Sequence, residues 1–584
     1  MDIQRTILLV IFAMSLFFLW DRWQIYQGRP SMLSPTPPAA EKKVDAPAVP
    51  ATPGEVGAVP AAPQQGGQAA APVAPTTATG APAQPGPSAE RVRVETDMVR
   101  AEIDPNGAVL AHVELLKQQV APDWTAGGIV GLFTGKKQDR DAHIVLLEWS
   151  KNRIYLARTG LTAPGGAKLP NHLTPFTLLD GPTRMGPDQQ TLEVRFAAEA
   201  SGIKLIKTYV FKRGQYDIEV RHEIQNTTAE PVTPSVYLQL VRDGNKPEGE
   251  SSLYYTFTGP AVYTDAKKYQ KFSFEDIAKK KENHATEAKD GWIAMIQHYF
   301  VSAWVPPQGE AREIRSAQDG PNLYSLSTVM PLAPIAPGAS TTSKASLWVG
   351  PEDQHALSAL APGLELVVDY GWLTTIAKPL YWLLEFLHRM VGNWGWSIIL
   401  LTIIVKAAFY PLSAASYKSM ARMKEVTPRM MKIREQYAND KQKMNLAMME
   451  LYKTEKINPL GGCLPIVVQI PVFIALYWVL LASVEMRNSP WMLWVQDLAT
   501  PDPWFILPVV MVVTMIVQYK LNPTPPDPVQ AKMMAVMPYI FGAMFFFFPA
   551  GLVLYWLVNN VLSILQQWYI NKQIKQIAQR KAAG

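Results

Sequence analysis

Residues 393–412 read NWGWSIILLTIIVKAAFYPL, and this stretch decides the fold class. Between Trp396 and its end, the residues are apolar or aromatic except for Ser397, Thr402 and Lys406. Such a run is typical of a transmembrane helix, because roughly 20 apolar residues cross a hydrocarbon core of about 30 Å. The stretch therefore predicts an α-helical integral membrane protein and argues against a soluble globular chain or a disordered one.

Further apolar stretches follow, at 461–481 and 504–518. From Met533 to Tyr569 another 37 residues carry no charge. As one helix this last stretch would be about 55 Å long, nearly twice the hydrocarbon thickness. The residues Pro549-Ala550-Gly551 are therefore predicted to separate two spans. We expect five transmembrane helices between residues 392 and 571.

A sixth span is predicted at the N-terminus. Ile7–Trp20 is apolar and no small-residue cleavage site follows it, so residues 1–26 are read as an uncleaved anchor, with a cleaved signal peptide as the alternative. Residues 27–90 form the next segment, and 13 of the chain's 49 prolines lie between positions 31 and 90. This composition predicts a flexible linker.

Residues 91–350 have the sequence pattern of β-strands. Arg91–Glu95 and Asp217–Ile224 alternate polar and apolar side chains, and Arg213-Gly214 suggests a turn between two strands. We expect a large all-β domain, a β-sandwich. It shows no nucleophile motif, phosphate loop or metal-ligand spacing, and the chain's one cysteine excludes an intramolecular disulfide and a cysteine-cluster zinc site. The prediction is a binding or spacing domain with no metal and no cofactor.

Residues 351–391 are predicted to be a connector followed by an amphipathic helix. Apolar residues recur at helical spacing on one face: Leu373, Ile376, Leu380, Leu384, Leu387 and Val391. Charged and polar residues lie on another face: Lys378, Glu385, His388 and Arg389. This pattern suits a helix lying in the membrane interface; packing against the β-domain is the alternative.

The basic residues between the spans predict the orientation. Residues 413–460 carry ten Lys or Arg and five Asp or Glu, whereas the loop 482–503 has Arg487 as its one basic residue. By the positive-inside rule the basic segments face the cytoplasm. Six crossings then leave both termini cytoplasmic, including a short basic tail at 572–584, and put the β-domain on the outer side. Residues 413–457 are predicted to form a cytoplasmic helical hairpin that breaks near Asn439-Asp440, held to anionic lipid or docked to a partner.

Lys406 is the most informative residue of the predicted membrane core. It is the one charged side chain within ten residues on either side, and the predicted spans supply no Asp or Glu to pair with it. Ionisable residues at such positions usually face a bundle interior or a watery cavity and suggest function. Thr402 shares its helical face. The alternative is that Lys406 extends its long side chain to the headgroups.

The other spans carry weaker polar stripes, which serve helix packing or line a polar cavity together with Lys406. Each of these polar stripes lies on one helical face: Gln469 with Tyr477; Thr514 with Gln518; Tyr555 with Asn559 and Ser563.

Four segments together resemble the YidC/Oxa/Alb family of membrane-protein insertases: residues 393–412, YKSMARMKEVTPRM at 417–430, NPLGGCLPIVVQIPVFIALYWVL at 458–480 and FPAGLVLYWLVNN at 548–560. The order of anchor, proline-rich linker, β-domain, interfacial helix and five-span core resembles the Gram-negative type, with a large periplasmic domain, in the inner membrane. The resemblance implies a non-enzymatic insertase and chaperone. It would insert, fold and assemble inner-membrane proteins through a hydrophilic groove, alone or with the Sec translocon.

The resemblance also implies site residues and partners. The groove and substrate-contact positions fall on Lys406, Thr402, Pro465, Gln469, Phe473, Tyr477, Tyr555, Trp556 and Asn559. The recruitment positions of the hairpin fall on Lys418, Arg422, Lys424, Arg429, Lys432 and Arg434. Implied partners are nascent membrane proteins, the Sec translocon, the ribosome and signal-recognition machinery, and anionic lipids. A monomer without sequence-specific nucleic-acid binding is expected.

Two positions depart from the family pattern. The groove cation of the family is usually arginine, and here it is Lys406, which keeps the charge without the bidentate geometry. Trp556 stands where a second tyrosine is common. Two other functions stay open at this point: an intramembrane hydrolase using Thr402 and Lys406, and a transporter.

Overall fold

The computed structural model describes residues 90–120, 128–134, 142–164, 167–247, 256–437, 440–455, 464–522 and 528–583. The predicted anchor, and the predicted linker up to its last residue, lie outside the described residues. The described part of the chain divides into two compact units, a β unit (90–120 and 142–368) and a helical unit (128–134 and 369–583).

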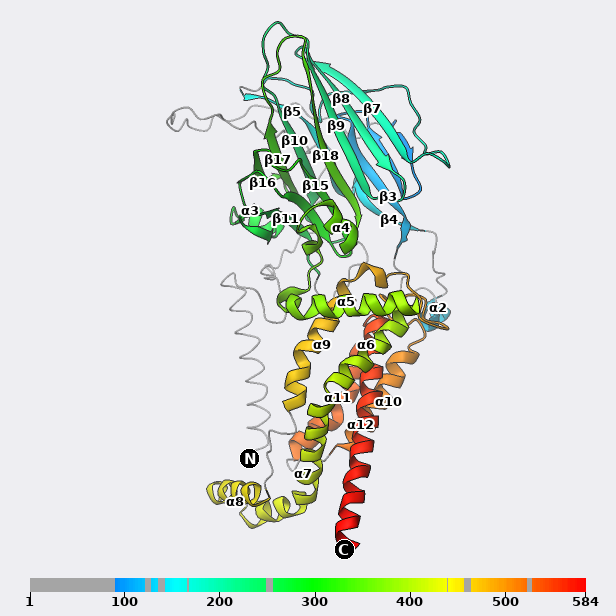
Figure 1. Ribbon diagram of the computed structural model, residues 1–584, viewed down its shortest axis with the longest axis vertical. Coiled ribbons are helices and arrows are strands. Elements are labelled where there is room, and N and C mark those ends of the chain that lie inside the picture. Colours follow the sequence, from blue (N-terminus) through cyan, green and yellow to red (C-terminus); the bar gives the residue numbers. More distant parts are fainter. Residues whose placement is uncertain are drawn as a thin grey trace. The chain divides into compact units, whose positions relative to one another are not determined.

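The β unit contains two sheets of nine strands each (Figure 1). In spatial order, the first sheet contains β1 (Val92–Glu95), β2 (Val99–Asp104), β3 (Val109–Gln119), β4 (His143–Trp149), β5 (Ile154–Thr162), β10 (Ser235–Asp243), β17 (Leu323–Pro331), β16 (Arg312–Gly320) and β13 (Glu287–Ala288). The second contains β12 (Lys268–Lys271), β11 (Gly259–Thr264), β14 (Trp292–Gln297), β15 (Phe300–Val305), β18 (Ser340–Pro351), β9 (Asp217–Asn226), β8 (Ile203–Lys212), β7 (Thr191–Ala200) and β6 (Thr177–Leu178). Short helices α3 (Phe274–Ala278), α4 (Gln354–Leu360) and η2 (Leu364–Val367) accompany them.

The strands predicted from alternation are confirmed. β1 and β9 cover the two alternating runs, and β8 and β9 pair antiparallel across the predicted turn, where Gly214 has a φ of 73°. A positive φ is the reason for glycine at that position. Long-range pairing completes the sheets, because β10 lies between β5 and β17 in antiparallel register. The unit is therefore an antiparallel β-rich domain, as predicted.

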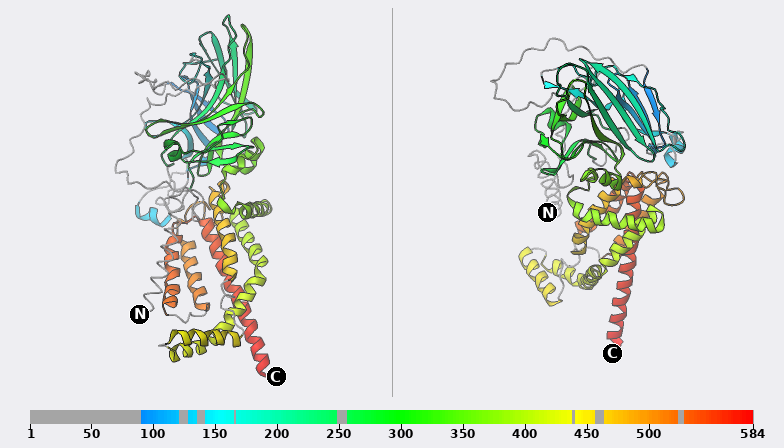
Figure 2. Two further views of the ribbon diagram at one scale, coloured as in Figure 1. Left: turned by 90° about the vertical axis from the view of Figure 1, so that its left-hand side faces the viewer. Right: turned by 45° about the horizontal axis from the view of Figure 1, so that its top comes forward.

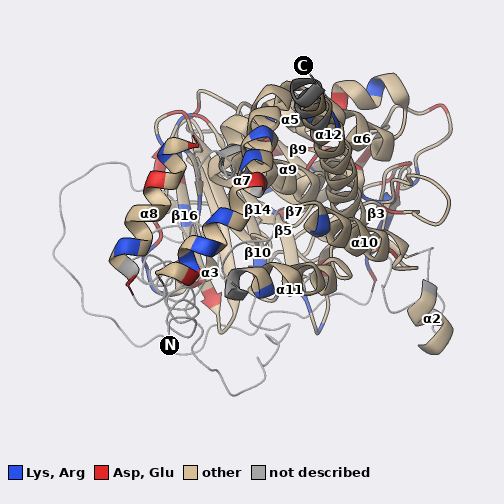
Figure 3. Cartoon of the chain, turned by 90° about the horizontal axis from the view of Figure 1, so that it is seen from below, with Lys and Arg blue, Asp and Glu red and all other residues tan. Residues whose placement is uncertain are grey.

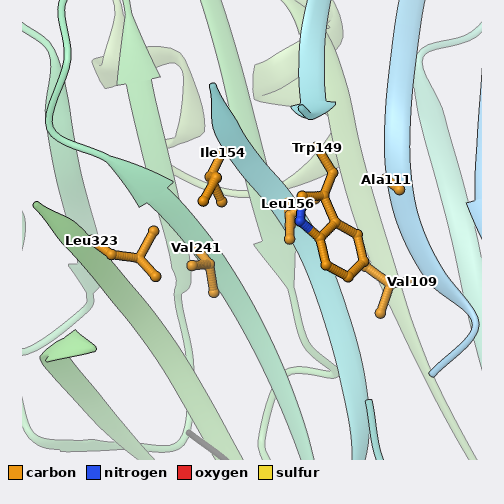
Figure 4. Close-up of a cluster of buried hydrophobic side chains, with 7 residues drawn as sticks. All are labelled: Val109, Ala111, Trp149, Ile154, Leu156, Val241 and Leu323. Atoms are coloured by element: carbon orange, nitrogen blue, oxygen red, sulfur yellow. The ribbon is translucent and has the colours of Figure 1, made fainter. Parts of the chain in front are cut away.

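Side chains from the two sheets meet in the interior. The Tyr155 hydroxyl donates to the Met295 carbonyl at 3.0 Å, and the Trp304 indole N–H donates to the Gln239 carbonyl at 3.2 Å. These bonds join strands of different sheets, which makes the arrangement a sandwich. Figure 4 shows a separate buried apolar cluster, all of it from strands of the first sheet: Val109, Ala111, Trp149, Ile154, Leu156, Val241 and Leu323.

The interior of the sandwich also holds charged and polar groups. The Lys207 ammonium is fully buried and donates to the carbonyls of Gly107 and Thr159, each at 2.6 Å. Nearby, the Thr159 hydroxyl lies 2.8 Å from His222 Nε2. Burial lowers the pKa of Lys207 to about 7 and that of His222 to about 3, because a charged side chain loses its hydration inside the sandwich.

Lys207 predicts a rise of stability with pH. Its pKa is about 7 in the native state and near 10.5 without burial, so between those values the unfolded chain binds more protons and the free energy of unfolding increases with pH. The slope from this group is at most about 1.4 kcal/mol per pH unit. We expect Lys207→Met to remove most of the rise between pH 7 and 9 in urea unfolding of the full chain in detergent micelles, followed by the β-sheet signal.

Two other groups titrate outside this window and serve as internal references. His222 contributes its own rise at lower pH, between about 3 and 6.5. Burial raises the pKa of Tyr237 above its usual value near 10, so its contribution is lost only in stronger base. An unchanged slope between pH 7 and 9 in Lys207→Met would show that Lys207 is not the titrating group.

The helical unit contains eight long helices among its described residues (Figures 1 and 2). They are α5 (Thr374–Val391), α6 (Trp394–Ala408), α7 (Tyr410–Gln436), α8 (Lys441–Thr454), α9 (Leu464–Ala482), α10 (Ile506–Leu521), α11 (Pro528–Phe545) and α12 (Ala550–Ala583). Shorter ones are α2 (Gly128–Thr134), η3 (Gly371–Leu373) and η5 (Val484–Met486). α12 packs against α6, α7 and α10, and α5 packs against α6 and α9.

The predicted amphipathic helix exists as α5, but its exposed face differs from the prediction. Leu384 and Leu387 of the predicted apolar face are buried, whereas Val391 of the same face is exposed. The exposed face carries large apolar side chains beside the expected charges: Trp382, Phe386 and Met390. Tyr381, which the prediction left out, is on the buried face, where its hydroxyl donates to the Glu485 carboxylate at 2.7 Å.

The predicted span from Trp396 to Leu412 is wrong as a single straight helix. α6 ends at Ala408, and α7 begins at Tyr410 with Pro411 in its first turn. Proline has no N–H to donate to the preceding turn and its ring clashes with the carbonyl four residues earlier, so a continuous helix is broken there. The predicted helix boundary at Pro549 is confirmed, because α11 ends at Phe545 and α12 begins at Ala550.

Within the described residues, no single helix has both the length and the hydropathy to cross a membrane. α6 and the part of α7 from Tyr410 to Met423 have that length and hydropathy only when taken together, and the two segments are bent by 65° relative to each other. α12 continues to Ala583, so most of the predicted tail at 572–584 is helical.

Candidate functional site

The buried amine of Lys406 is the centre of the site. It projects from α6 to α12, where its Nζ donates to the Ser563 hydroxyl at 2.9 Å, and Ser563 donates in turn to the Asn559 carbonyl at 2.7 Å. Lys406 is only 6% exposed. The sequences of α6 and of α9 to α12 contain no Asp or Glu. The positive charge of Lys406 is therefore bound by a hydroxyl and is not neutralised by a carboxylate of these helices. A buried charge in this state would be stabilised by an anion.

A second polar contact joins α9 to α12 one turn away. Gln469 Nε2 donates to the Asn559 side-chain oxygen at 3.0 Å. Asn559 therefore connects the two contacts, since its carbonyl accepts from Ser563 and its side chain accepts from Gln469. The structure thus brings together Lys406, Gln469, Asn559 and Ser563 from three helices.

Aromatic side chains lie beside this polar cluster on the same two helices. The Phe473 ring stacks on Tyr555 at 5.8 Å and meets Trp556 edge-on at 4.2 Å between centroids. Further along α9, Tyr477 meets Phe548 at 6.3 Å. Phe473, Tyr477 and Trp556 are half-buried, whereas Tyr555 is buried. The predicted aromatic positions of α9 and α12 therefore contact one another, one turn from the Gln469–Asn559 contact.

Other predicted positions do not join the cluster. The Thr402 hydroxyl is 1% exposed and donates to the Ile398 carbonyl of its own helix at 2.7 Å. Thr514 likewise donates within its own helix, to the Met511 carbonyl. Pro465 lies in the first turn of α9, and its side chain is outside the described residues. A hydroxyl–lysine pair of the kind a hydrolase needs is therefore not formed between Thr402 and Lys406, whose hydrogen bonds go elsewhere.

One contact was missed by sequence reasoning. The Tyr417 hydroxyl donates to the Ser563 carbonyl at 3.5 Å from α7. Tyr417 follows the helix break at Pro411, so its position relative to Lys406 could not be extrapolated from α6. In the sequence, Tyr417 was notable only as the first residue of the stretch 417–430.

A small apolar cavity lies between the ends of α9 and α12 and the α9–α10 loop. Its lining residues are Tyr477, Leu480, Leu481, Met486, Leu498, Pro549, Gly551 and Leu552. Among the described residues, no group of three or more His, Cys, Asp or Glu is placed to hold a metal ion.

The basic segment folds into two helices, α7 and α8. Asp440 caps α8 by accepting from the Lys443 backbone N–H, which places the break where it was predicted. The helices pack through Val426 and Met430 with Met423, Met448, Leu451 and Tyr452 around them. Figure 3 shows Lys and Arg along α7 and α8. Of the predicted recruitment residues, Lys418, Arg422, Arg429 and Lys432 are exposed and Arg434 is half-buried, while the Lys424 side chain lies outside the described residues.

Two family models together match almost all of the described chain. Residues 91–383 match the YidC periplasmic domain, and residues 386–578 match the 60Kd inner membrane protein model. A membrane protein insertase YidC of Cupriavidus necator is 54% identical over 579 residues, which is 98% of each chain. The chain belongs to the YidC family of membrane protein insertases. A Bordetella avium relative of the same name is 54% identical over 581 residues, 99% of this chain and all of the other.

A solved structure of an active YidC insertase, with its first transmembrane domain resolved, covers 82% of this chain at 17% identity with a TM-score of 0.38. The family models and the curated relatives carry the assignment. The family is an inner-membrane insertase family with a periplasmic domain, and it is not a family of enzymes.

Proposed function

We propose that this chain inserts nascent membrane proteins into the inner membrane along the polar and aromatic surface shared by α6, α9 and α12. The observation that carries the proposal is the Lys406 ammonium, buried among apolar helices and bound to Ser563 at 2.9 Å. A charge in such surroundings is costly and usually serves function. The proposed role is to stabilise hydrophilic residues of a substrate partway across the bilayer.

The driving force for insertion is the partition of the substrate's apolar segment into lipid. The protein lowers the barrier for the polar flanks. A substrate tail that displaces Ser563 from Lys406 exchanges one hydrogen bond for another, and an acidic tail also gains the attraction of the charge. The half-buried rings of Phe473, Tyr477 and Trp556 offer an apolar path for the transmembrane segment. Thr402 and Pro465 are proposed to line the same path, and the path is proposed to widen into a hydrophilic groove when substrate enters.

The membrane arrangement is also part of the proposal. Six transmembrane helices, with a five-helix core at 392–571, place both termini in the cytoplasm and residues 91–350 in the periplasm. Exposed valines on α10 support a lipid-facing surface: Val509, Val510, Val513 and Val517. The basic hairpin then faces the cytoplasm, as the positive-inside rule requires.

The hairpin at 413–457 is the proposed recruitment surface. Its exposed basic residues suit the ribosome, signal-recognition machinery and anionic lipid. The Sec translocon is proposed as a partner for some substrates, with a monomer of this chain sufficient for others. The β-domain has no proposed ligand.

Reconstitution tests the function directly. Proteoliposomes containing this chain alone should protect the periplasmic segment of a small inner-membrane protein from added protease, and protein-free liposomes should not. Equal protection in both would contradict autonomous insertion. Adding purified Sec translocon to the same vesicles measures the share of insertion that needs it.

A further inference from the structure

The short helix α2 lies in an unusual position in the chain. It falls between β3 and β4 of the sandwich, yet it belongs to the compact unit formed by the helices. The Ile129 backbone N–H donates to the Pro503 carbonyl at 3.0 Å, in the segment that precedes α10. α2 is therefore attached at the end of the helical unit where α10 begins, the end at which α5 also lies (Figures 1 and 2).

The composition of α2 does not suit water. Its sequence GIVGLFT contains no charged residue, and Leu132 is 75% exposed and Phe133 87% exposed. A seven-residue helix has too few hydrogen bonds to be stable alone in water. Apolar side chains on several sides favour surroundings that are apolar as well.

Other exposed residues at this end of the helical unit are apolar too. α5 exposes Trp382, Phe386 and Met390. Trp504, next to the attachment point at Pro503, is exposed, as is Leu493 in the loop between α9 and α10. Tryptophan is enriched where a protein meets the boundary between headgroups and acyl chains. α2 thus lies at an end of the helical unit where other exposed side chains already have the composition of a membrane interface.

We propose that α2 inserts Leu132 and Phe133 into the outer leaflet of the bilayer at the headgroup boundary, as a second interfacial anchor at the same end of the helical unit as α5. The occupant of this apolar surface is lipid, because the exposed residues belong to the unit that contains the apolar helices and lie at the end where Trp382 and Trp504 are also exposed. This inference rests on the orientation given under the proposed function. The proposal adds a membrane contact made by a segment that lies, in sequence, between strands β3 and β4 of the sandwich.

A fluorescence experiment on the full chain tests the contact. Cys463 is the chain's one cysteine, so Cys463→Ser provides a background for single labels. Phe133→Cys carries an environment-sensitive fluorophore in vesicles of phosphatidylethanolamine and phosphatidylglycerol, with lipids that bear a shallow spin-label quencher. Thr191→Cys, on an exposed position of β7, is the aqueous control, and Val513→Cys on α10 is the lipid control. Leu132→Cys repeats the test if Phe133→Cys does not fold.

We expect the label at position 133 to lose more than half of its emission to the lipid quencher and to resist iodide supplied on both sides of the membrane. The label at 191 should do the opposite. A label at 133 that iodide quenches as strongly as at 191, or that neither quencher reaches, would overturn the lipid contact. Insertion activity measured in the same vesicles separates the two claims, since retained activity without lipid quenching rejects only the α2 anchor.

Discussion

Replacing Lys406 by alanine is expected to lower the insertion of substrates with acidic translocated tails by about tenfold. A tenfold change corresponds to about 1.4 kcal/mol, a modest fraction of the attraction between a carboxylate and an ammonium in a poorly hydrated site. Substrates with neutral tails lose only a hydrogen-bond donor and should be affected much less. The measurement is protease protection in proteoliposomes, with matched substrates that differ only in the charge of the tail.

Lys406→Arg is the matched control for this prediction. Arginine keeps the charge, so acidic-tailed substrates should insert nearly as well as with Lys406. Lys406→Met keeps the length of the side chain without its charge and should behave like alanine. If Lys406→Ala lowers the insertion of acidic and neutral tails by the same factor relative to the unchanged chain, the electrostatic role is wrong and Lys406 serves helix packing.

Replacing Trp304 by alanine is expected to destabilise the β unit by about 3–5 kcal/mol, the usual cost of removing a large core aromatic side chain. Trp304 is 1% exposed on β15, and its indole N–H donates to Gln239 of the opposite sheet at 3.2 Å. The substitution leaves a cavity between the sheets and an unsatisfied carbonyl. Pulse proteolysis of the full chain across a urea series should show the transition of the β unit at lower urea.

Leu178→Ala provides the comparison within the same unit. Leu178 lies on the edge strand β6 and is exposed, so its loss should cost less than about 1 kcal/mol. If both variants unfold at the same urea concentration, Trp304 does not join the two sheets as described.

Much of this architecture could be predicted because it depends on local patterns. Period-two alternation identified β9, and the missing N–H of Pro549 marked the boundary before α12. The order of the strands could not be predicted in this way, since β10 pairs with both β5 and β17 through contacts distant in sequence. The burial of Lys207 was also missed. Alternation indicates which face of a strand a residue occupies, but it does not show which backbone carbonyls lie close enough to accept a hydrogen bond from its side chain.

The residues of the site could be predicted from the sequence, but the contacts between them could not. Lys406 and the face containing Asn559 and Ser563 were visible as polar residues in apolar helices. Their pairing depends on the rotation of α6 against α12, which helical spacing alone does not determine. Pro411 could have indicated the break between α6 and α7, but the apolar run around it favoured the prediction of one continuous span. That break turns α7 so that Tyr417 reaches Ser563.

Photocross-linking from Phe473 tests the central claim most directly. Phe473 is half-buried beside Trp556, and a photoreactive phenylalanine analogue changes its shape little. In membranes carrying stalled nascent chains of a small inner-membrane protein, we predict adducts to the nascent transmembrane segment that disappear when the chain is released, and none from the same analogue at Val513. Adducts of equal yield from both positions, or adducts only from the 413–457 hairpin, would contradict a substrate path beside Lys406.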